Sequence, residues 1–212
     1  ELDIRGLRGT ASPKLLIKIF SLNHSRLKSI CFGEDSTDFE SPEDDVLTCY
    51  PHIEHLKIDI KSCEMLGLLL KALPNIRSFH VSISEFSNRS PSKKFLSNSV
   101  IFHHLVNFEL HSIDLFWTLD EIIDLLHRMP CLRKTTVNIR TKDEAFLKKE
   151  YLNARLSTTL IEFCFILRYY YLDENIDKDI LLKHWPTQIP IGVWHDQRVH
   201  RIVIHSIPLG VC

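Results

Sequence analysis

The stretch LPNIRSFHVSI, residues 73–83, ends one apolar run and begins another of different periodicity. Leu-Pro stops a helix, because proline has no backbone N–H and its ring clashes with the preceding turn. After it, Ile76, Phe79 and Val81 place apolar side chains at positions i, i+3 and i+5. The alternation that begins at Phe79 has the period of two that is typical of a half-buried strand. The stretch therefore predicts a helix that ends at Pro74 and a strand soon after it.

The same template, apolar at i, i+3 and i+5, occurs seven times along the chain. Successive copies start 26, 23, 29, 27, 28 and 39 residues apart. The first five intervals lie in or near the roughly 20–29 residues of leucine-rich repeats. Leu2 and Ile4 resemble the end of an eighth, truncated copy, and only Thr135 departs from apolar. The seven copies are Leu27/Ile30/Phe32, Ile53/Leu56/Ile58, Ile76/Phe79/Val81, Leu105/Phe108/Leu110, Leu132/Thr135/Val137, Leu160/Phe163/Phe165 and Val199/Ile202/Ile204.

Several intervals between the copies have helical patterns. The clearest, residues 118–129, begins with a capping box of Thr118 and Glu121 and ends before Pro130. Two further helices are expected, one from Ser62 to the stop at Pro74 and a weaker one from Thr141 with Glu144 to about Leu156. The unit that recurs is therefore strand, loop, helix and strand.

Units of this kind join parallel strands by right-handed crossovers and stack into a curved solenoid. We predict an α/β fold, an irregular leucine-rich-repeat solenoid with parallel strands on its concave face and helices on its convex face. It is irregular because the copies lack the Asn or Cys position of the strict pattern. The expected organisation is one domain, 1–212, of about seven repeats that is truncated at its N-terminus, with 185–212 as a C-terminal capping segment.

Alternate residues of a strand point to opposite faces, so positions i+2, i+4 and i+6 of each copy line the concave face. The two expected rows are Cys31, Lys57, His80, Glu109, Thr136, Cys164, Val203 and Gly33, Asp59, Ser82, His111, Asn138, Ile166, His205. The centre of this face is mixed in charge. The predicted protein-binding residues there are Lys57, Arg77, His80, Glu109 and His111, and both histidines are expected to titrate near their ordinary pKa of about 6.5.

A second candidate surface surrounds ILRYYYLDE, residues 166–174, where apolar groups replace polar ones. Aromatic and aliphatic clusters of this kind supply interface hot spots. The predicted contact residues here are Ile161, Ile166, Tyr169, Tyr170 and Tyr171. Two interpretations stay open: contact with a protein partner, or burial under the C-terminal segment.

Composition narrows the partners. The 26 basic and 27 acidic side chains leave a net charge of −1, which favours neither nucleic acid nor an anionic membrane. The longest apolar run, MLGLLLKAL, is interrupted by Lys71 and ended by Pro74, so no membrane span is expected. Six cysteines without a CxxC pair are interpreted as free thiols. They indicate a reducing compartment, the cytoplasm or the nucleus.

No catalytic pattern is present, neither a G-x-S-x-G elbow nor a glycine-rich phosphate loop among six glycines. His52 and His55 would point to opposite faces of a strand, so neither a metal nor a cofactor is expected. We predict a non-catalytic chain. The acidic segment 33–45, with seven carboxylates in thirteen residues, is interpreted as a solvated loop or as a regulatory edge with phosphorylation sites.

Three long phrases carry a narrower resemblance: YPHIEHLKIDIKSCEMLGLLLKALPNIRSF, HSIDLFWTLDEIIDLLHRMPCLRK and HWPTQIPIGVWHDQRVHRIVIHSIPLG. They resemble the leucine-rich-repeat region of an expanded invertebrate family of F-box proteins. The resemblance implies a substrate-recognition subunit of a cullin-RING ubiquitin ligase, in which the repeats hold the protein target. No F-box pattern occurs within 1–212, so the Skp adaptor would be bound only by a segment upstream of Glu1. The alternative is a free-standing leucine-rich-repeat scaffold or inhibitor without an F-box.

Overall fold

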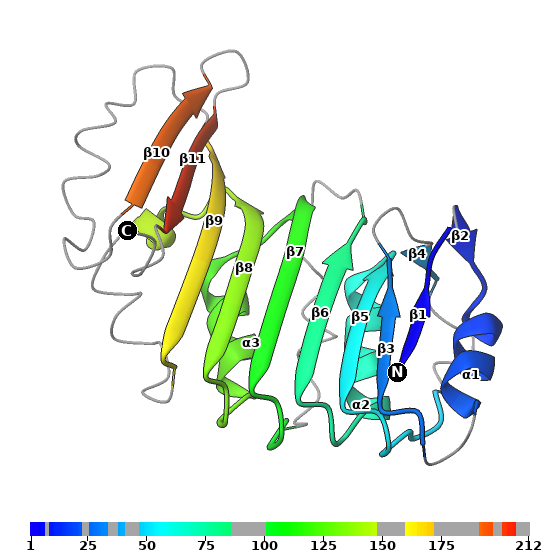
Figure 1. Ribbon diagram of the computed structural model, residues 1–212. Coiled ribbons are helices and arrows are strands. Elements are labelled where there is room, and N and C mark those ends of the chain that lie inside the picture. Colours follow the sequence, from blue (N-terminus) through cyan, green and yellow to red (C-terminus); the bar gives the residue numbers. More distant parts are fainter. Residues whose placement is uncertain are drawn as a thin grey trace.

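The protein forms one open, mostly parallel sheet with helices packed against it (Figure 1). The computed structural model describes residues 1–6, 9–22, 26–33, 38–40, 47–85, 101–147, 160–171, 191–196 and 201–206. Within them, the strand order is β1-β3-β5-β6-β7-β8-β9-β11-β10, while β4 pairs with β5 and β2 pairs with β4. The strands are β1 (Leu2–Ile4), β2 (Thr10–Ala11), β3 (Ser29–Phe32), β4 (Asp38–Phe39), β5 (His55–Ile60), β6 (Ser78–Ile83), β7 (Asn107–Phe116), β8 (Lys134–Thr141), β9 (Glu162–Tyr170), β10 (Ile191–Asp196) and β11 (Arg201–Ser206).

The strands from β5 to β9 pair in parallel with matching register. His80 lies between Lys57 and Glu109, as the template spacing predicts. The cross-strand row continues through Thr136 to Cys164. The sequence therefore predicted both the parallel pairing and the register across these five strands.

Burial alternates along each strand. Leu56, Phe79 and Phe108 are at most 2% exposed, whereas the residues next to them in sequence are partly exposed. The buried side chains face α2 (Cys63–Ala72) and α3 (Leu119–His127), which lie on one side of the sheet (Figure 1). We call the opposite side, which carries Lys57 and His80, the open face.

The helices begin at polar caps. The Ser62 hydroxyl accepts from the backbone N–H of Met65 at the start of α2. Thr118 and Glu121 form the predicted capping box of α3, with Glu121 Oε2 accepting from the Thr118 N–H at 2.8 Å. These two helices are confirmed. A third helix, α1 (Pro13–Ser21), follows Ser12 and was not predicted, although Ser-Pro is a common helix start.

The helix predicted from Thr141 differs in its start. Thr141 is the last residue of β8, and its hydroxyl donates to the Trp117 carbonyl. The cap is instead Asp143, whose carboxylate accepts from the N–H groups of Ala145 and Leu119. It precedes the 3₁₀ helix η1 (Glu144–Leu147). The rest of the predicted helix, to about Leu156, lies outside the described residues.

The last two strands do not continue the parallel pattern. β11 pairs antiparallel with β9, and β10 pairs antiparallel with β11. Ile202 and Ile204 of the seventh template copy are buried as predicted, but their strand runs in the opposite direction. The apolar template marks the buried positions of a strand but not its direction, which follows here from the pairing of β11 with β9.

The acidic segment is only partly a loop. Asp38 and Phe39 form β4, and the Phe39 side chain is fully buried beside Phe32. Most of residues 33–45, and residues 86–100, lie outside the described residues. No described helix is long and apolar enough to cross a membrane.

Candidate functional site

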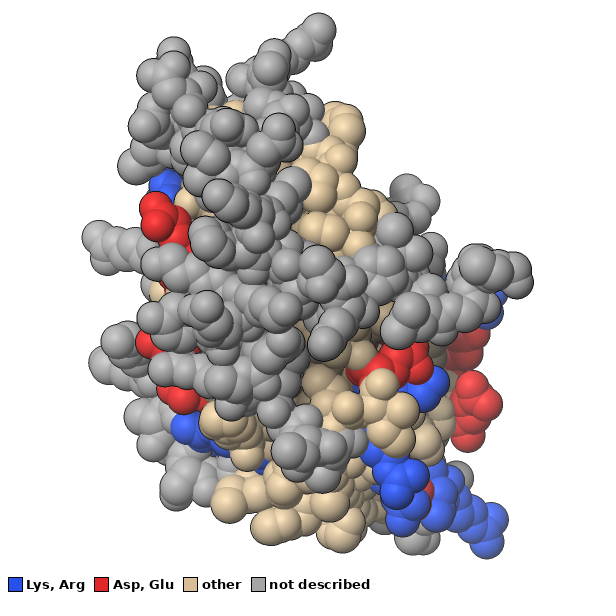
Figure 2. All heavy atoms as spheres, turned by 90° about the vertical axis from the view of Figure 1, so that its left-hand side faces the viewer, with Lys and Arg blue, Asp and Glu red and all other residues tan. Residues whose placement is uncertain are grey.

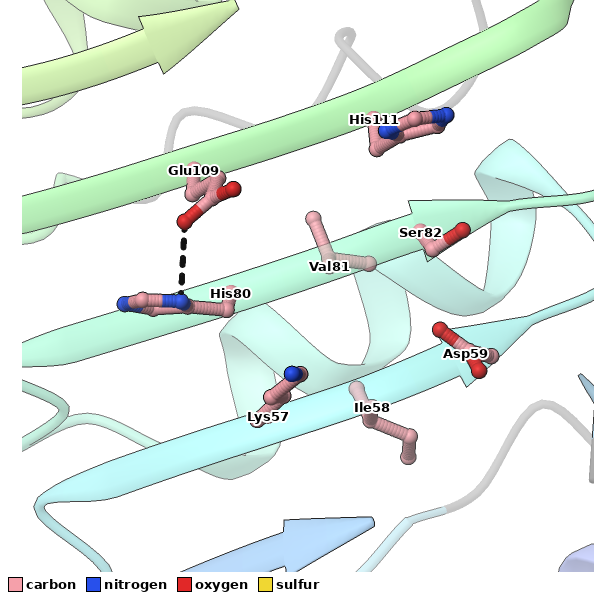
Figure 3. A pocket seen from close by; sticks show the side chains of 8 residues that line it. All are labelled: Lys57, Ile58, Asp59, His80, Val81, Ser82, Glu109 and His111. Carbon is pink, nitrogen blue, oxygen red and sulfur yellow. Dashed lines mark ion pairs between the residues drawn. The ribbon is translucent and has the colours of Figure 1, made fainter. Parts of the chain in front are cut away.

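The open face carries the predicted row of polar side chains. Lys57, His80 and Glu109 occupy equivalent positions on β5, β6 and β7 (Figure 3). One step further along the strands, Asp59, Ser82 and His111 form a second row. Strand alternation turns all six side chains away from α2 and α3.

These six residues line a hollow of about 340 Å³. Its floor is formed at Ile58 and Val81, whose side chains are buried (Figure 3). A hollow of this volume is at the small end of ligand-binding pockets, which span about 300–1,000 Å³. It accommodates one or two amino-acid side chains.

The hollow offers both signs of charge. His80 Nδ1 and Glu109 Oε2 are 2.9 Å apart, and both side chains are nearly half exposed. Lys57 forms no ion pair with any described residue. An ammonium group, an imidazole and a carboxylate on three adjacent strands can therefore hydrogen-bond a polar segment that crosses them.

A hydrogen-bonded chain leads from the hollow toward β9. The Arg168 guanidinium donates to Asn138 Oδ1, and because Arg168 cannot accept, the amide oxygen must face it. Asn138 Nδ2 then donates to His111 Nδ1 at 3.1 Å. This arrangement requires His111 Nδ1 to accept, as it does in the neutral imidazole with its proton on Nε2. Burial and the positive charge of Arg168 lower the pKa of His111. The prediction that it titrates at its ordinary pKa is therefore wrong.

Beyond this chain, cations and aromatic rings alternate on the open face. Arg140 Cζ lies 3.9 Å from the centroid of the Phe116 ring and 4.4 Å from that of Tyr170. Lys142 Nζ lies 4.4 Å from the Phe116 centroid. The Arg201 guanidinium lies within 6 Å of both the Tyr170 and Trp194 centroids, at 5.9 and 5.7 Å. We call the series Lys142, Phe116, Arg140, Tyr170, Arg201 and Trp194 the cation–aromatic row.

Arg77 was predicted on the concave face near His80, but it does not line the hollow. It precedes β6, and its Nε is 3.6 Å from Glu54 Oε2. Glu54 also pairs with Lys28 at 2.6 Å. Arg77 therefore belongs to an exposed ion-pair network before the strands start, where the hydrogen bond and charge of Lys28 lower the pKa of Glu54.

The predicted apolar surface is divided between two faces. Tyr169 is 3% exposed and Tyr171 is 8% exposed, whereas Tyr170 lies on the open face against Arg140. Strand alternation separates these neighbours, so a three-tyrosine contact surface does not exist. Ile166 is half-buried in the second polar row, and Ile161, 78% exposed, precedes β9.

The C-terminal strands meet β9 at the edge of the sheet. Ile166 lies opposite His205 and Tyr169 opposite Ile202 in the β9–β11 pair. The described part of the predicted capping segment, residues 191–196 and 201–206, therefore pairs at the edge of the sheet. It leaves Ile166, Arg168 and Tyr170 partly exposed on the open face.

The sequence reasoning missed the cation–aromatic row. The position of Arg140 on the open face could have been predicted, since Arg140 follows Thr136 and Asn138 on the same face of β8. The position of Phe116 could not, because an irregularity between Ser112 and Phe116 shifts the register and places Phe116 opposite Arg140. Arg201 was missed because its strand was expected to run parallel.

No group of three or more His, Cys, Asp or Glu side chains in the described part of the chain could hold a metal ion. The described cysteines, Cys31, Cys49, Cys63, Cys131 and Cys164, are free thiols. Burial raises the pKa of the Cys63 thiol, which disfavours its reactive thiolate form. Comparison with protein families, curated proteins and solved structures returned no match.

Proposed function

We propose that this chain is a non-catalytic protein-binding domain, a leucine-rich-repeat-like solenoid that holds a segment of a protein target on its open face. The observation that carries the proposal is the pair of in-register polar rows, which meet in a hollow of about 340 Å³. Side chains from several consecutive strands project side by side there. A face of this kind is how solenoid proteins present an extended binding surface.

The dimensions favour a peptide segment over a folded surface. Five parallel strands spaced about 4.8 Å apart extend over roughly 19 Å, the length of about six residues of an extended chain. One side chain of such a segment would enter the hollow, near Lys57 and Glu109. Charge pairs at exposed positions determine register and association rate more than affinity. Seen from the end that carries β10 and β11, the described surface also places basic and acidic groups side by side (Figure 2).

The cellular role rests on the sequence resemblance. In that role the domain is the substrate-recognition region of an F-box subunit of a cullin-RING ubiquitin ligase in the cytoplasm or nucleus. A free-standing scaffold or inhibitor is the alternative. Co-purification with the Skp adaptor distinguishes the two roles. In the ligase role, a longer protein that includes an F-box should co-purify with the adaptor, whereas residues 1–212 alone should not.

The binding face is tested with random peptides displayed on phage and selected on residues 1–212. Enriched peptides should lose binding to the variant Lys57→Glu/His80→Ala/Glu109→Lys, which reverses two charges of the first row and removes its imidazole. Lys71→Glu, on the exposed side of α2, is the matched control and should keep binding.

Circular dichroism must first show that both variants fold. The proposal fails if the selected peptides bind the triple variant as tightly as the parent chain. It also fails if Lys71→Glu removes binding to the same extent, because the peptides would then bind the helix side.

A further inference from the structure

The cation–aromatic row is a second binding feature on the open face, separate from the hollow. No described carboxylate lies within ion-pair distance of Arg140, Lys142 or Arg168. Asp114 forms no ion pair with Arg168. Its charge raises the pKa of Arg168, but burial and the charge of Arg201 lower that pKa by more. Arg140, Lys142 and Arg168 are therefore three cations without a described ion-pair partner at this end of the sheet.

The Arg140 guanidinium is held in place by its contacts and still has a donor to offer. Phe116 and Tyr170 contact it, and their rings meet edge to face with centroids 5.8 Å apart. Its Nε is buried and has no hydrogen-bond partner among the described residues. A buried donor without a partner is unfavourable, and an oxygen atom of a bound anion would satisfy it.

The spacing of the cations fits an extended acidic chain. Arg140 and Lys142 both lie over Phe116, at 3.9 and 4.4 Å from its centroid, so their charges are at most about 8 Å apart. In an extended peptide, side chains at i and i+2 share one face and are about 7 Å apart. The row then continues past Tyr170 to Arg201.

The Phe116 ring argues against a nucleic acid at Arg140 and Lys142, although Trp194 at the other end of the row is 55% exposed. Phe116 is 7% exposed and has two cations over it, so its face is not available to stack on a base. The whole chain has a net charge of −1, without the excess of basic residues that phosphate backbones attract. The occupant that fits is therefore a peptide that carries carboxylates.

We propose that the cation–aromatic row binds an acidic protein segment in extended conformation, with carboxylates at alternate positions paired to Lys142 and Arg140. The proposal deepens the protein-binding function and rests on it. The target would present acidic side chains at one end and a polar side chain to the hollow at the other.

The test uses a fluorescent peptide of four Ser-Glu repeats, with four Ser-Gln repeats and a single-stranded oligouridylate as comparison probes. Binding to residues 1–212 is measured by fluorescence anisotropy at low and at physiological salt. The Ser-Glu peptide should bind and the Ser-Gln peptide should not. Salt should weaken binding, because the Debye length falls to about 8 Å at physiological ionic strength.

Arg140→Gln and Lys142→Gln should each weaken binding by about two- to fivefold, as expected for exposed charge pairs. Lys71→Gln removes the same charge from the helix side and should leave binding unchanged. Equal affinity for the Ser-Gln peptide, equal or tighter binding of oligouridylate, or an equal loss in Lys71→Gln would each overturn the proposal.

The two proposals fail in different ways. If phage-selected peptides depend on Lys57 and Glu109 but the Ser-Glu peptide does not bind, the acidic-segment site is wrong and the binding face stands. If the Ser-Glu peptide binds through Arg140 while the triple variant keeps its selected peptides, the hollow is wrong and the cation–aromatic row stands.

Discussion

The strand assignment predicts opposite outcomes for two adjacent residues on β5. Leu56 is 2% exposed and lies between Ile30 of β3 and Phe79 of β6, both also buried. Leu56→Ala removes three carbon atoms from a site enclosed on both sides, and such changes cost about 2–5 kcal/mol of unfolding free energy. Lys57 points to the open face, so Lys57→Ala should change stability by less than about 0.5 kcal/mol.

Thermal unfolding followed by circular dichroism measures the difference. At about 2–4 °C per kcal/mol for a chain of this size, Leu56→Ala should lower Tm by about 4–20 °C. Lys57→Ala should stay within about 2 °C of the parent. Leu56→Asp, which buries a charge, should not fold. If Leu56→Ala and Lys57→Ala melt alike, the two faces of β5 are wrongly assigned and the reasoning about the open face fails with them.

Two further predictions concern caps and pH. Asp143→Ala should cost about 1 kcal/mol, read from urea unfolding, because the carboxylate caps both α3 and η1; an unchanged midpoint would contradict the capping role. Folding lowers the pKa of His111, so the unfolded chain binds more protons than the folded chain. The stability that comes with neutral His111 is therefore present above about pH 6.5, and it is lost as the pH falls through the pKa of the folded state. His111→Gln should therefore lose less stability than the parent between pH 7.5 and 5, whereas an equal loss in both proteins would show that His111 does not titrate in this way.

The regular part of the fold could be predicted because it repeats one local rule. Each parallel strand places its buried residues at the same template positions, so one correct register fixes the neighbouring ones. Ser62 and Thr118 mark their helices by local chemistry that does not depend on tertiary contacts. The row from Lys57 to Glu109 follows from the same alternation, and the structure brings its members together in one hollow.

The other features depend on contacts between distant segments. The direction of β11 follows from its pairing with β9, which the apolar template does not encode. The position of Phe116 opposite Arg140 follows from a register shift inside β7. Tyr169 is different, since alternation along β9 already predicts that it faces the helices, and the sequence interpretation grouped the tyrosines by composition instead.

Asn138 connects the two parts of the open face. Its carbonyl oxygen is committed to Arg168 and its amino group to His111, and at 9% exposed it has little freedom to turn. Protonation of His111 at Nδ1 would place two donors face to face and break this chain. The amide therefore favours neutral His111 beside the hollow and holds the Arg168 guanidinium by a hydrogen bond. A target that spans both parts must match a fixed order of groups, mixed charge first and acidic side chains second, and this order is the source of the specificity that we propose.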